Sequence, residues 1–354
     1  MDMNKNETYA IGLMSGTSLD GLDIVYVKFN ENETYGFQVL AFETITYSPD
    51  LREQLKNSIS LKETNLIELD KSFGHFIGVK TNDFIQKNKI ENLDFIASHG
   101  HTVFHQPEEG FTKQIGNGQL IADITKRLVV CDFRTQDVEL GGQGAPLVPI
   151  GDKLLFSNYS ACVNLGGFAN ISFEKQQERI AFDICPVNIV LNYFSQKLGY
   201  EYDNKGELSS KGKIDLQLLE KLNSIDFYSK DYPKSLGVEW VNDKIFPHLT
   251  KVEEMQTILR TFTEHIAIQI ANNIRDFDSV LFTGGGVFND FLIGRIKKLV
   301  NTKIVIPSST IINYKEALIF ALLGLLKLRG KTNCLASVTG AKRNHSSGKI
   351  FHAN

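Results

Sequence analysis

The chain has 354 residues, with 38 Lys and Arg against 41 Asp and Glu, and a formal net charge of −3 at pH 7. This length suits two hydrophobic cores better than one, and 42% apolar and 22% charged residues are ordinary for a globular protein. The slight negative charge, without a dense basic stripe, argues against a nucleic-acid partner. The longest apolar run, residues 317–328, is shorter than the roughly 20 residues that span a bilayer. Because residues 1–7 are polar and lack the apolar core of a secretory signal, we expect a cytoplasmic protein without a membrane partner.

The first strands of the chain follow a pattern that occurs twice. Each copy has a strand, a glycine-containing turn and a returning strand, followed by a third strand, as is typical of β-hairpins. The expected strands are residues 9–14, 22–27 and 37–47 in the first copy, and 161–165, 169–173 and 180–185 in the second.

Helical patterns follow each set of strands. They cover residues 66–86, 186–198, 257–277, 287–300 and 313–328, with further strands expected at 279–283 and 303–306. A duplicated unit of this kind predicts an α/β fold with two domains that face a cleft. We expect an N-terminal lobe over residues 1–155 and a C-terminal lobe over 156–354, with the helix at 313–330 able to pack back on the first lobe.

The first glycine turn, within residues 12–23, is rich in hydroxyl and carboxylate side chains. Backbone N–H groups and hydroxyls in such a turn can form a concave anion site. Asp20 and Asp23 would suit a hydrated Mg²⁺. An ordinary polar hairpin loop is the alternative interpretation.

Two further glycine turns repeat this logic, Gly166-Gly167 and Gly284-Gly285-Gly286. The latter follows a strand and precedes a helix, where glycine allows close approach of a nucleotide and the helix N-terminus favours negative charge. Each turn alone is a weak signal, but the three together fit one nucleotide held between two lobes. The sequence has no G-x-x-x-x-G-K-[ST], which excludes a P-loop enzyme, and no G-x-G-x-x-G spacing, which disfavours a Rossmann dehydrogenase.

Asp183 follows the strand-like residues 179–182 and precedes a helix. A carboxylate at the C-terminal edge of a strand points towards the ligand crevice of an α/β fold. It could serve as a general base. A helix N-cap or loop aspartate is an equally good interpretation.

Three histidines, His99, His101 and His105, have the spacing H-x-H-x₃-H. This resembles a metal site on one face of a strand, but no further ligand is near, and we favour hydrogen bonding in a substrate pocket or in the core. Arg134 could bind a carboxylate through two hydrogen bonds. A buried salt bridge with a neighbouring aspartate, residue 132 or 137, is equally plausible.

Four cysteines, Cys131, Cys162, Cys185 and Cys334, stand far apart without a C-x-x-C pair. Three of them lie in apolar, strand-like runs. We interpret all four as buried reduced thiols and expect neither a disulfide framework nor a zinc site.

Together these motifs resemble the anhydro-N-acetylmuramic acid kinase family over nearly the whole chain. The matching segments are residues 12–23, 98–105, 114–118, 132–134, 141–149, 164–167, 233–235, 283–286 and 315–317, of which 12–23 and 141–149 are very specific. The resemblance implies two actin/hexokinase-like (ribonuclease H-like) domains with an interlobe cleft, and ATP with Mg²⁺ as cofactor. It implies a kinase of peptidoglycan recycling, in which water opens 1,6-anhydro-N-acetylmuramic acid and the freed O6 takes the γ-phosphoryl group, giving N-acetylmuramic acid 6-phosphate and ADP.

The resemblance also implies roles for individual residues. Asp183 matches the family's catalytic aspartate, which activates the water. The implied ATP contacts are Gly16, Thr17, Ser18, Leu19, Asp20, Gly21, Leu22, Asp23, Gly166, Gly167, Gly284, Gly285 and Gly286. The implied sugar contacts are His99, Gly100, Arg134, Asn188 and Glu316, with Arg134 suited to the lactyl carboxylate. Mg²⁺ would arrive with ATP near Asp20 and Asp23 rather than at a metal site of the protein's own, and the family resemblance makes a homodimer reasonable.

Two segments depart from the family pattern. The family usually reads D-T-G-P-G-N around its aspartate, whereas residues 183–188 read D-I-C-P-V-N, and Val238 stands where arginine is common. The departures leave open another amino-sugar kinase of the same fold or a catalytically weak sugar sensor. An actin- or Hsp70-like ATPase fits less well, because the chain lacks the substrate-binding extension of such chaperones.

Overall fold

The computed structural model describes residues 6–16, 19–32 and 35–354. The chain forms two compact units, one of Met1–Leu155 with Tyr314–Asn354 and the other of Phe156–Asn313. The division at residue 155 coincides with the expected lobe boundary. Residues 314–354 belong to the first unit, so the helix expected at 313–330 packs back on that unit, and the segment after it, which we expected in the second lobe, does so as well.

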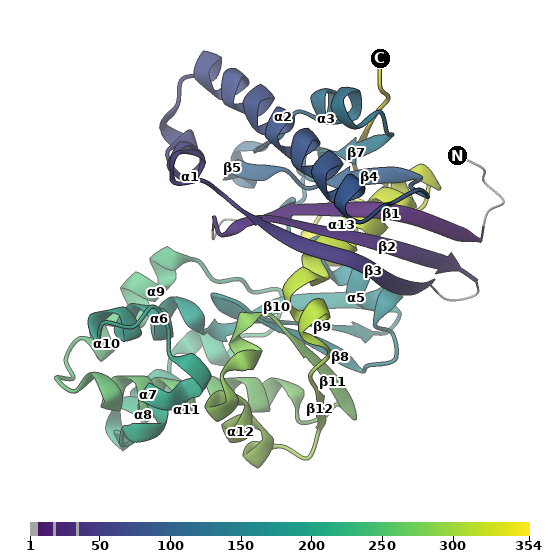
Figure 1. Ribbon diagram of the computed structural model, residues 1–354. Helices are drawn as coiled ribbons and strands as arrows, with labels where there is room; N and C mark the ends of the chain where they lie inside the picture. The colour runs from purple at the N-terminus through teal and green to yellow at the C-terminus, as the bar shows by residue number, and fades with distance from the viewer. Residues whose placement is uncertain (1–5, 17–18, 33–34) are drawn as a thin grey trace. The chain divides into compact units, whose positions relative to one another are not determined.

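The first unit contains eight of the described strands (Figure 1). They are β1 (Glu7–Ser15), β2 (Gly21–Glu31), β3 (Tyr35–Thr46), β4 (Phe95–Ser98), β5 (His101–Gln106), β6 (Phe111–Ile115), β7 (Val129–Cys131) and β13 (Lys349–Phe351). The α-helices assigned to it are α1 (Pro49–Lys56), α2 (Glu63–Lys87), α3 (Gly118–Thr125), α4 (Thr135–Glu139), α5 (Pro149–Leu155), α14 (Ala336–Thr339) and, from Tyr314 onwards, α13 (Ser309–Leu328). Two short 3₁₀ turns, Ser58–Ser60 and Pro107–Glu109, complete it.

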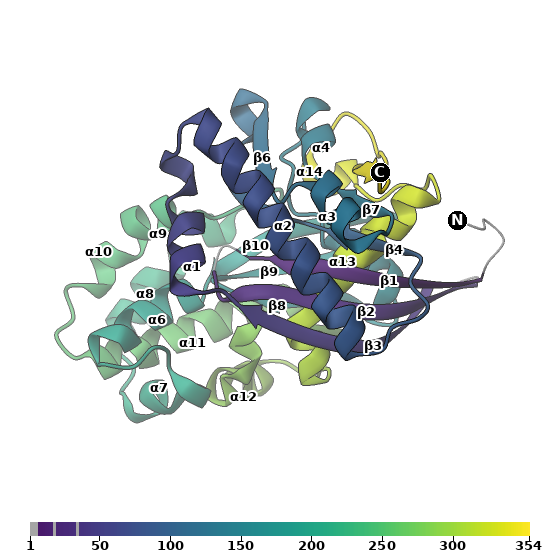
Figure 2. The ribbon, with the colours of Figure 1, turned by 45° about the horizontal axis from the view of Figure 1, so that its top comes forward.

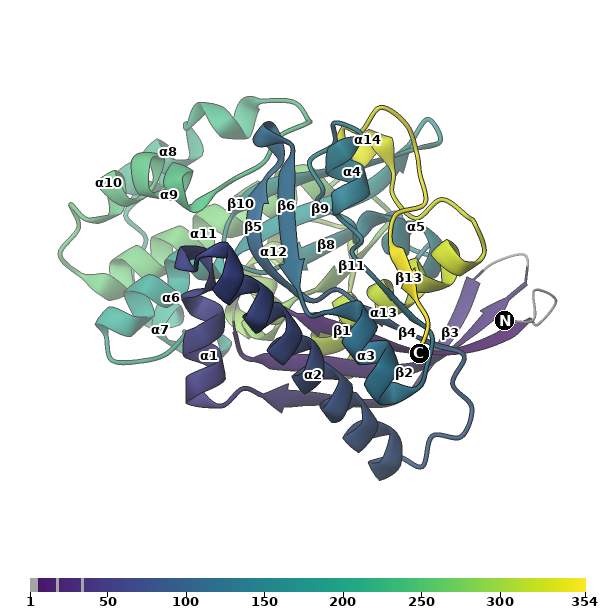
Figure 3. The ribbon, with the colours of Figure 1, turned by 90° about the horizontal axis from the view of Figure 1, so that it is seen from above.

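Six of these strands form one sheet in the order β13-β7-β4-β1-β2-β3. Strands β1, β2 and β3 pair antiparallel, whereas β4 is parallel to both β1 and β7. Because side chains alternate along a strand, Ile11 and Leu13 of β1 join the core formed with α2 and α3. Helices α2 and α3 lie side by side over this face (Figure 3).

Helix α13 covers the opposite face of the first sheet (Figure 2). Its residues 317–326 are all buried, as expected for a helix that is apolar all round. A Cβ on Gly12 of β1 would lie 2.0 Å from the carbonyl oxygen of Ala317, so only glycine permits this close packing. Within the described residues, no helix has both the length and the apolar character required to cross a membrane.

The second unit has five described strands and seven described α-helices (Figure 1). The strands are β8 (Ala161–Leu165), β9 (Phe168–Lys175), β10 (Glu178–Pro186), β11 (Ser279–Thr283) and β12 (Lys303–Val305). The helices are α6 (Asn188–Lys197), α7 (Glu207–Lys211), α8 (Leu216–Asn223), α9 (Val238–Lys244), α10 (Phe246–Leu249), α11 (Met255–Ile274) and α12 (Asp290–Leu299). Three 3₁₀ turns are Asn204–Gly206, Asp226–Ser229 and Gly285–Phe288.

The sheet of the second unit repeats that of the first. Its order is β10-β9-β8-β11-β12, which corresponds to β3-β2-β1-β4-β7. The first three strands again pair antiparallel, and β11 is parallel to β8 and β12. The duplication predicted from the sequence is therefore confirmed, and this repeated α/β unit is the ribonuclease H-like domain of the actin/hexokinase-like fold. The cleft between the two lobes stays a prediction.

Candidate functional site

The turn between β1 and β2 carries most of the residues expected at ATP. Thr17 and Ser18 lie outside the described residues. Leu19 has a φ of 60°, and its N–H donates to the carbonyl of Gly16 at 3.3 Å. A Cβ on Gly21 would lie 2.5 Å from the carbonyl oxygen of Ile45 in β3. Glycine is thus required at this point for packing against β3, whatever the turn binds.

Carboxylates gather beside this turn. Asp20 lies exposed in the turn, whereas Asp23 is the third residue of β2, within the strand expected at residues 22–27. The pKa of Asp23 is raised to about 6. Burial contributes most to the rise, a hydrogen bond from Thr44 Oγ1 at 2.6 Å partly opposes it, and repulsion from Glu316 and Asp20 adds to it. Leu22, between the two aspartates, is buried in the core. Only its backbone is therefore placed to contact a nucleotide.

Glu316 is the third of these carboxylates. Its side chain retains solvent access, yet the protein around the carboxyl raises its pKa, with Arg134 and Lys315 opposing the rise. Lys315 itself is buried and pairs with Asp152 at 2.6 Å. Carboxylates that repel one another are stabilised by a cation, and oxygen ligands of this kind are those that Mg²⁺ prefers. The chemistry of these donors suits Mg²⁺, but within the described residues the three carboxylates do not form a ready set of metal ligands, so the ion would have to arrive with the nucleotide.

Arg134 is held by two neighbours at the start of α4. Its Nε donates to Nε2 of His99 at 2.9 Å, and its Nη1 donates to the carbonyl of Gly144 at 2.6 Å. The salt bridge considered from the sequence does not form: Asp132 pairs with Lys349 at 2.7 Å, and Asp137 accepts from the N–H of Gly144. The guanidinium is thus fixed in direction without a carboxylate bonded to it, which suits the recognition of an anionic group.

His99 is a neutral hydrogen-bond acceptor. Because Arg134 can only donate, Nε2 of His99 accepts, and the proton lies on Nδ1, which donates to the carbonyl of Gly100 at 3.0 Å. Burial, and then the charge of Arg134, lower the pKa of His99 well below its ordinary value. Gly100 has a φ of +74°, and a Cβ there would lie 2.4 Å from the carbonyl oxygen of Ile115.

The three closely spaced histidines have separate partners. Gly100 interrupts the chain between β4 and β5, so His99 and His101 are not two positions of one strand as the sequence suggested. His101 Nδ1 lies 3.1 Å from Ser15 Oγ, which accepts from Tyr47 at 2.8 Å. Burial lowers the pKa of His101 to about 4. This chain of hydrogen bonds holds the end of β1, where the glycine turn begins.

Asp183 lies inside β10, within the strand expected at residues 180–185 and not beyond the end of one. The pairing of β10 with β9 shifts register between Asp183 and Cys185, a bulge of the kind that redirects a side chain. Oδ2 of Asp183 accepts from the N–H of Leu236 at 2.8 Å, and its own N–H donates to the carbonyl of Lys234 at 3.1 Å. Burial raises the pKa of the Asp183 carboxyl, and the Leu236 hydrogen bond partly offsets the rise. A carboxylate of raised pKa accepts a proton more readily than an ordinary one.

The contacts that hold Asp183 come from residues 234 and 236, in and just after the segment 233–235 that matches the family pattern, and the sequence does not indicate their role in the site. Lys234 and Leu236 follow residues 225–232 and are far from Asp183 in the sequence. No periodicity or motif spacing indicates their backbone contact with β10. The Pro-Lys-Ser run at residues 233–235 is the one signal that could have pointed to it.

A pocket of about 680 Å³ opens beside the third glycine turn. Gly285, Gly286 and Asn188 line it, together with the exposed aromatic side chains of Tyr202 and Phe288. A Cβ on Gly285 would meet nothing within 4 Å, so the backbone is open to a ligand at that point. Cavities of roughly 300–1,000 Å³ accommodate small-molecule ligands. Asn188, which we expected at the sugar, thus lies beside the turn that we expected at the nucleotide.

The helix expected directly after the third turn begins later than predicted. Gly284 has a φ of +83° and is followed by the 3₁₀ turn Gly285–Phe288, and α12 starts only at Asp290. A Cβ on Gly284 would lie 2.7 Å from Asn164 Oδ1. The side chain of Asn289 caps α12 by accepting from the N–H of Leu292 at 2.9 Å.

The backbone of the Gly166-Gly167 turn is engaged in hydrogen bonds within its own hairpin and with the start of α6. The N–H of Gly166 donates to the carbonyl of Phe168 at 3.1 Å, so it is already engaged within the hairpin. The carbonyls of Gly166 and Gly167 accept from Asn188 and Val187. This turn therefore anchors the start of α6, and through it one wall of the pocket.

Residues 8–353 match the family model of anhydro-N-acetylmuramic acid kinase. The chain belongs to the anhydro-N-acetylmuramic acid kinase family. A relative of that name from Haemophilus influenzae is 35% identical over 386 aligned positions, which cover 99% of each chain. Another from Clostridioides difficile is 33% identical over 375 positions, covering 97% of this chain and 98% of the relative. The family resemblance inferred from the motifs is confirmed.

The departures from the family motif lie in the core. Ile184, Cys185 and Val187 are all buried in the cluster formed by β8, β9, β10, α6 and α11. The valine side chain therefore occupies the interior, and its N–H donates to the carbonyl of Gly167 at 2.8 Å. Val238, by contrast, is 48% exposed on α9. Cys185 and Val187, which stand where the family has glycine, are thus core residues, and the carboxyl of Asp183 is still held by Leu236.

Proposed function

We propose that this chain is an ATP-dependent kinase that opens 1,6-anhydro-N-acetylmuramic acid with water and phosphorylates the freed O6. The observation that carries this proposal is Asp183, a desolvated carboxylate held by the backbone of Leu236 in a chain that matches the family from residue 8 to residue 353. The reaction belongs to the recycling of cell-wall peptidoglycan.

Asp183 is the base of the reaction. It removes a proton from a water molecule, whose oxygen forms a bond to C1 of the sugar while the bond between C1 and O6 breaks. O6 then bonds to the γ-phosphorus of ATP as the bond to the ADP oxygen breaks. Burial raises the pKa of Asp183, which brings its proton affinity closer to that needed near neutral pH.

The pocket beside Gly285 takes the nucleoside of ATP. Its size suits a nucleoside, and Tyr202 and Phe288 offer aromatic surface to a base. The glycine turn between β1 and β2 contacts the phosphates. Mg²⁺ bound with the nucleotide would lie near Asp23, Asp20 and Glu316, where it would neutralise charge on the transferred group.

Arg134 binds the lactyl carboxylate of the sugar. His99 and Gly144 fix the direction of the guanidinium, and neither neutralises its charge. Glu316 and Gly100, which belong to the same unit, complete the sugar contacts. Asn188 belongs with the nucleotide pocket instead.

The decisive experiment incubates the purified protein with MgATP and 1,6-anhydro-N-acetylmuramic acid in water enriched in the heavy oxygen isotope. Mass spectrometry should find N-acetylmuramic acid 6-phosphate with the heavy isotope at C1. Phosphorylation of an open amino sugar, with the anhydro sugar untouched, would replace this proposal by an ordinary amino-sugar kinase. Binding of sugar without product from either substrate would indicate a sensor.

A cytoplasmic location and a homodimer are part of the same proposal. ATP is supplied in the cytoplasm, and the family resemblance supports the dimer. Sedimentation velocity at several protein concentrations would measure the oligomeric state, and a monomer throughout would remove that part of the proposal.

A further inference from the structure

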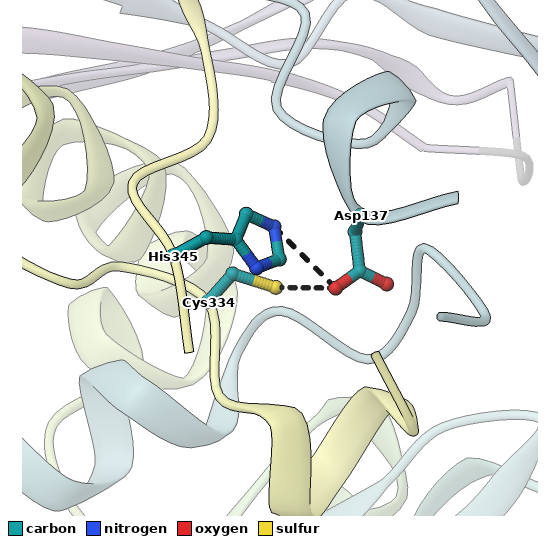
Figure 4. Close-up of side chains that lie close together, drawn as sticks. All are labelled: Asp137, Cys334 and His345. Carbon is teal, nitrogen blue, oxygen red and sulfur yellow. Dashed lines mark hydrogen bonds and ion pairs between the residues drawn. The ribbon is translucent and has the colours of Figure 1, made fainter. Parts of the chain in front are cut away.

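Three side chains from distant parts of the chain meet inside the first unit (Figure 4). Asp137 belongs to α4, and Cys334 and His345 lie on either side of α14. Their exposed fractions are 0%, 1% and 7%. Cys334 Sγ lies 3.0 Å from Asp137 Oδ1, and His345 Nε2 lies 3.5 Å from the same oxygen. All three donor atoms lie within 4.8 Å of one another.

The backbone fixes two of the three side chains next to each other. The N–H of Cys334 donates to the carbonyl of His345 at 3.1 Å, and the N–H of His345 donates back at 3.2 Å. The two residues thus form an antiparallel bridge, in which directly opposite side chains share one face. The pair is built into the backbone rather than brought together by flexible side chains.

The imidazole of His345 turns a lone pair towards Asp137. Its Nδ1 lies 3.1 Å from the carbonyl of Arg343. Since a carbonyl only accepts, Nδ1 carries a proton, and in the neutral ring Nε2 is then an acceptor. Buried Nε2 has no hydrogen-bond partner in the described part of the chain. An acceptor that faces a carboxylate at 3.5 Å is unfavourable unless a positive charge lies between them.

The carboxylate is also held in one orientation. Oδ2 of Asp137 accepts from the N–H of Gly144 at 2.7 Å, and Oδ1 accepts from Thr339 Oγ1 at 2.8 Å. Contacts of this kind, like the contact of His345 with Arg343, orient metal ligands in proteins and fix the tautomer of a ligating histidine. The surrounding hydrogen bonds therefore match those of a metal centre.

We infer that Asp137, Cys334 and His345 bind a divalent transition-metal ion of the zinc type. One sulfur, one imidazole nitrogen and one carboxylate oxygen are ligands that Zn²⁺ accepts, and a tetrahedral ion would place them about 3.4–3.6 Å apart. The two measured separations from Oδ1, 3.0 and 3.5 Å, need only small adjustments. The thiol proton of Cys334 leaves to solvent when the ion binds.

Two acidic ligands favour a cation at this site, and one neighbouring basic side chain opposes it. A thiolate and a carboxylate balance a charge of two, while Arg134, which bonds to Gly144, is the nearby cation that opposes it. Three protein ligands leave one position of a tetrahedral ion for water or for the hydroxyl of Thr339. An ion here would tie residues 334–345 to the loop at Gly144 that holds Arg134, and its role would be structural.

The test measures metal binding by the full-length protein directly. Protein freed of metal with a chelator is titrated with Zn²⁺ alone and with Co²⁺ alone, and bound metal is counted after gel filtration. We expect one Zn²⁺ per chain, a higher midpoint of thermal unfolding with Zn²⁺, and with Co²⁺ a thiolate charge-transfer band in the near ultraviolet. Cys334→Ser and His345→Gln should each weaken binding by about 100-fold or more, and Cys162→Ser, at another buried cysteine, should not.

Failure to bind stoichiometric Zn²⁺ at micromolar concentration in the wild-type protein would overturn the inference. It would leave a protonated imidazole paired with Asp137 as the explanation of the contact. Equal binding by Cys334→Ser and wild type would overturn it as well. The wild-type Co²⁺ spectrum keeps the test decisive if a variant does not fold, because the absence of a thiolate band excludes Cys334 as a ligand.

Discussion

Arg134 donates a hydrogen bond from its Nε to Nε2 of His99 over 2.9 Å. The contact orders both residues, because it fixes the tautomer of the histidine and the plane of the guanidinium. Since burial holds the pKa of His99 well below its ordinary value, the charge in this region comes from arginine and not from histidine across the neutral range.

Arg134→Lys should weaken binding of the anhydro sugar. A lysine cannot reproduce the planar fork that reaches His99 and Gly144 and also meets a carboxylate with two donors. We expect KM for 1,6-anhydro-N-acetylmuramic acid to rise about 10- to 100-fold, the equivalent of one charged hydrogen bond, with a smaller change in kcat. Steady-state kinetics would measure both.

The matched control for this variant is a substrate without the carboxylate. With 1,6-anhydro-N-acetylglucosamine, wild type and Arg134→Lys should have similar KM values. An equal loss on both sugars would contradict recognition of the carboxylate by Arg134.

Asp183→Asn should lower kcat by about 100- to 10,000-fold, because the amide cannot accept the proton of the water. The fold and nucleotide affinity should persist, since an amide oxygen can still accept from the N–H of Leu236. In the wild type, the base works only when ionised. Because burial raises its pKa, kcat/KM should fall as the pH drops through that raised value.

Asp243→Asn is the control for this experiment, since Asp243 is exposed on α9 and pairs with Lys244. It should leave the rate unchanged. Turnover close to that of wild type in Asp183→Asn would remove Asp183 as the base.

Asp23→Asn should stabilise the protein at neutral pH while impairing its use of MgATP. The folded-state pKa of about 6 lies above the ordinary value of 3.8, so stability is lost as the pH rises through about 6 and the carboxyl ionises. The loss begins near the unfolded-state pKa of 3.8. Allowing for partial solvent screening, we therefore expect the variant to gain about 1–2 kcal/mol near pH 8 and about half of that near pH 5. Urea unfolding at both pH values would measure it.

The exposed Asp83, which pairs with Lys80 on α2, supplies the comparison variant Asp83→Asn. It should show no such pH-dependent gain. Equal stabilisation of Asp23→Asn at both pH values would contradict a raised pKa at Asp23.

Adjacent glycines in the third turn should respond differently to alanine. Gly284 has a positive φ and no room for a Cβ, so Gly284→Ala should cost about 1–3 kcal/mol of stability. Gly285 has open space, so Gly285→Ala should fold normally and raise KM for ATP without changing KM for the sugar. An unchanged KM for ATP in Gly285→Ala would place the nucleotide elsewhere.

Much of the fold was predictable because its signals are local. Alternating apolar residues around glycine turns located the starts of β1, β2, β8 and β9 within about two residues, although β2 runs four residues beyond its expected end, and repetition of the pattern indicated the duplication. The predicted start of α12 was too early, because the 3₁₀ turn Gly285–Phe288 comes before the helix. The close packing of Gly284 on Asn164 sets this conformation, and helix propensity does not reveal it.

The site was only partly predictable, because its decisive contacts join distant segments. Motifs pointed to Asp183 and Arg134, but nothing local indicated that Leu236 holds the first or that His99 holds the second. Asp137 and Cys334, which meet in the buried cluster, are 197 positions apart in the sequence. Cysteine spacing alone therefore gave no sign of it.

The return of the chain to the first unit has a consequence for biosynthesis. Helix α13 covers one face of the first sheet, and β13 adds its edge strand beside β7. The ribosome makes these segments last, after all of the second unit. The nascent second unit can therefore complete its core first, while the earlier-made first sheet keeps an apolar face exposed. Chaperones would recognise that face until translation ends, and a chain released at residue 313 would be a target for proteolysis.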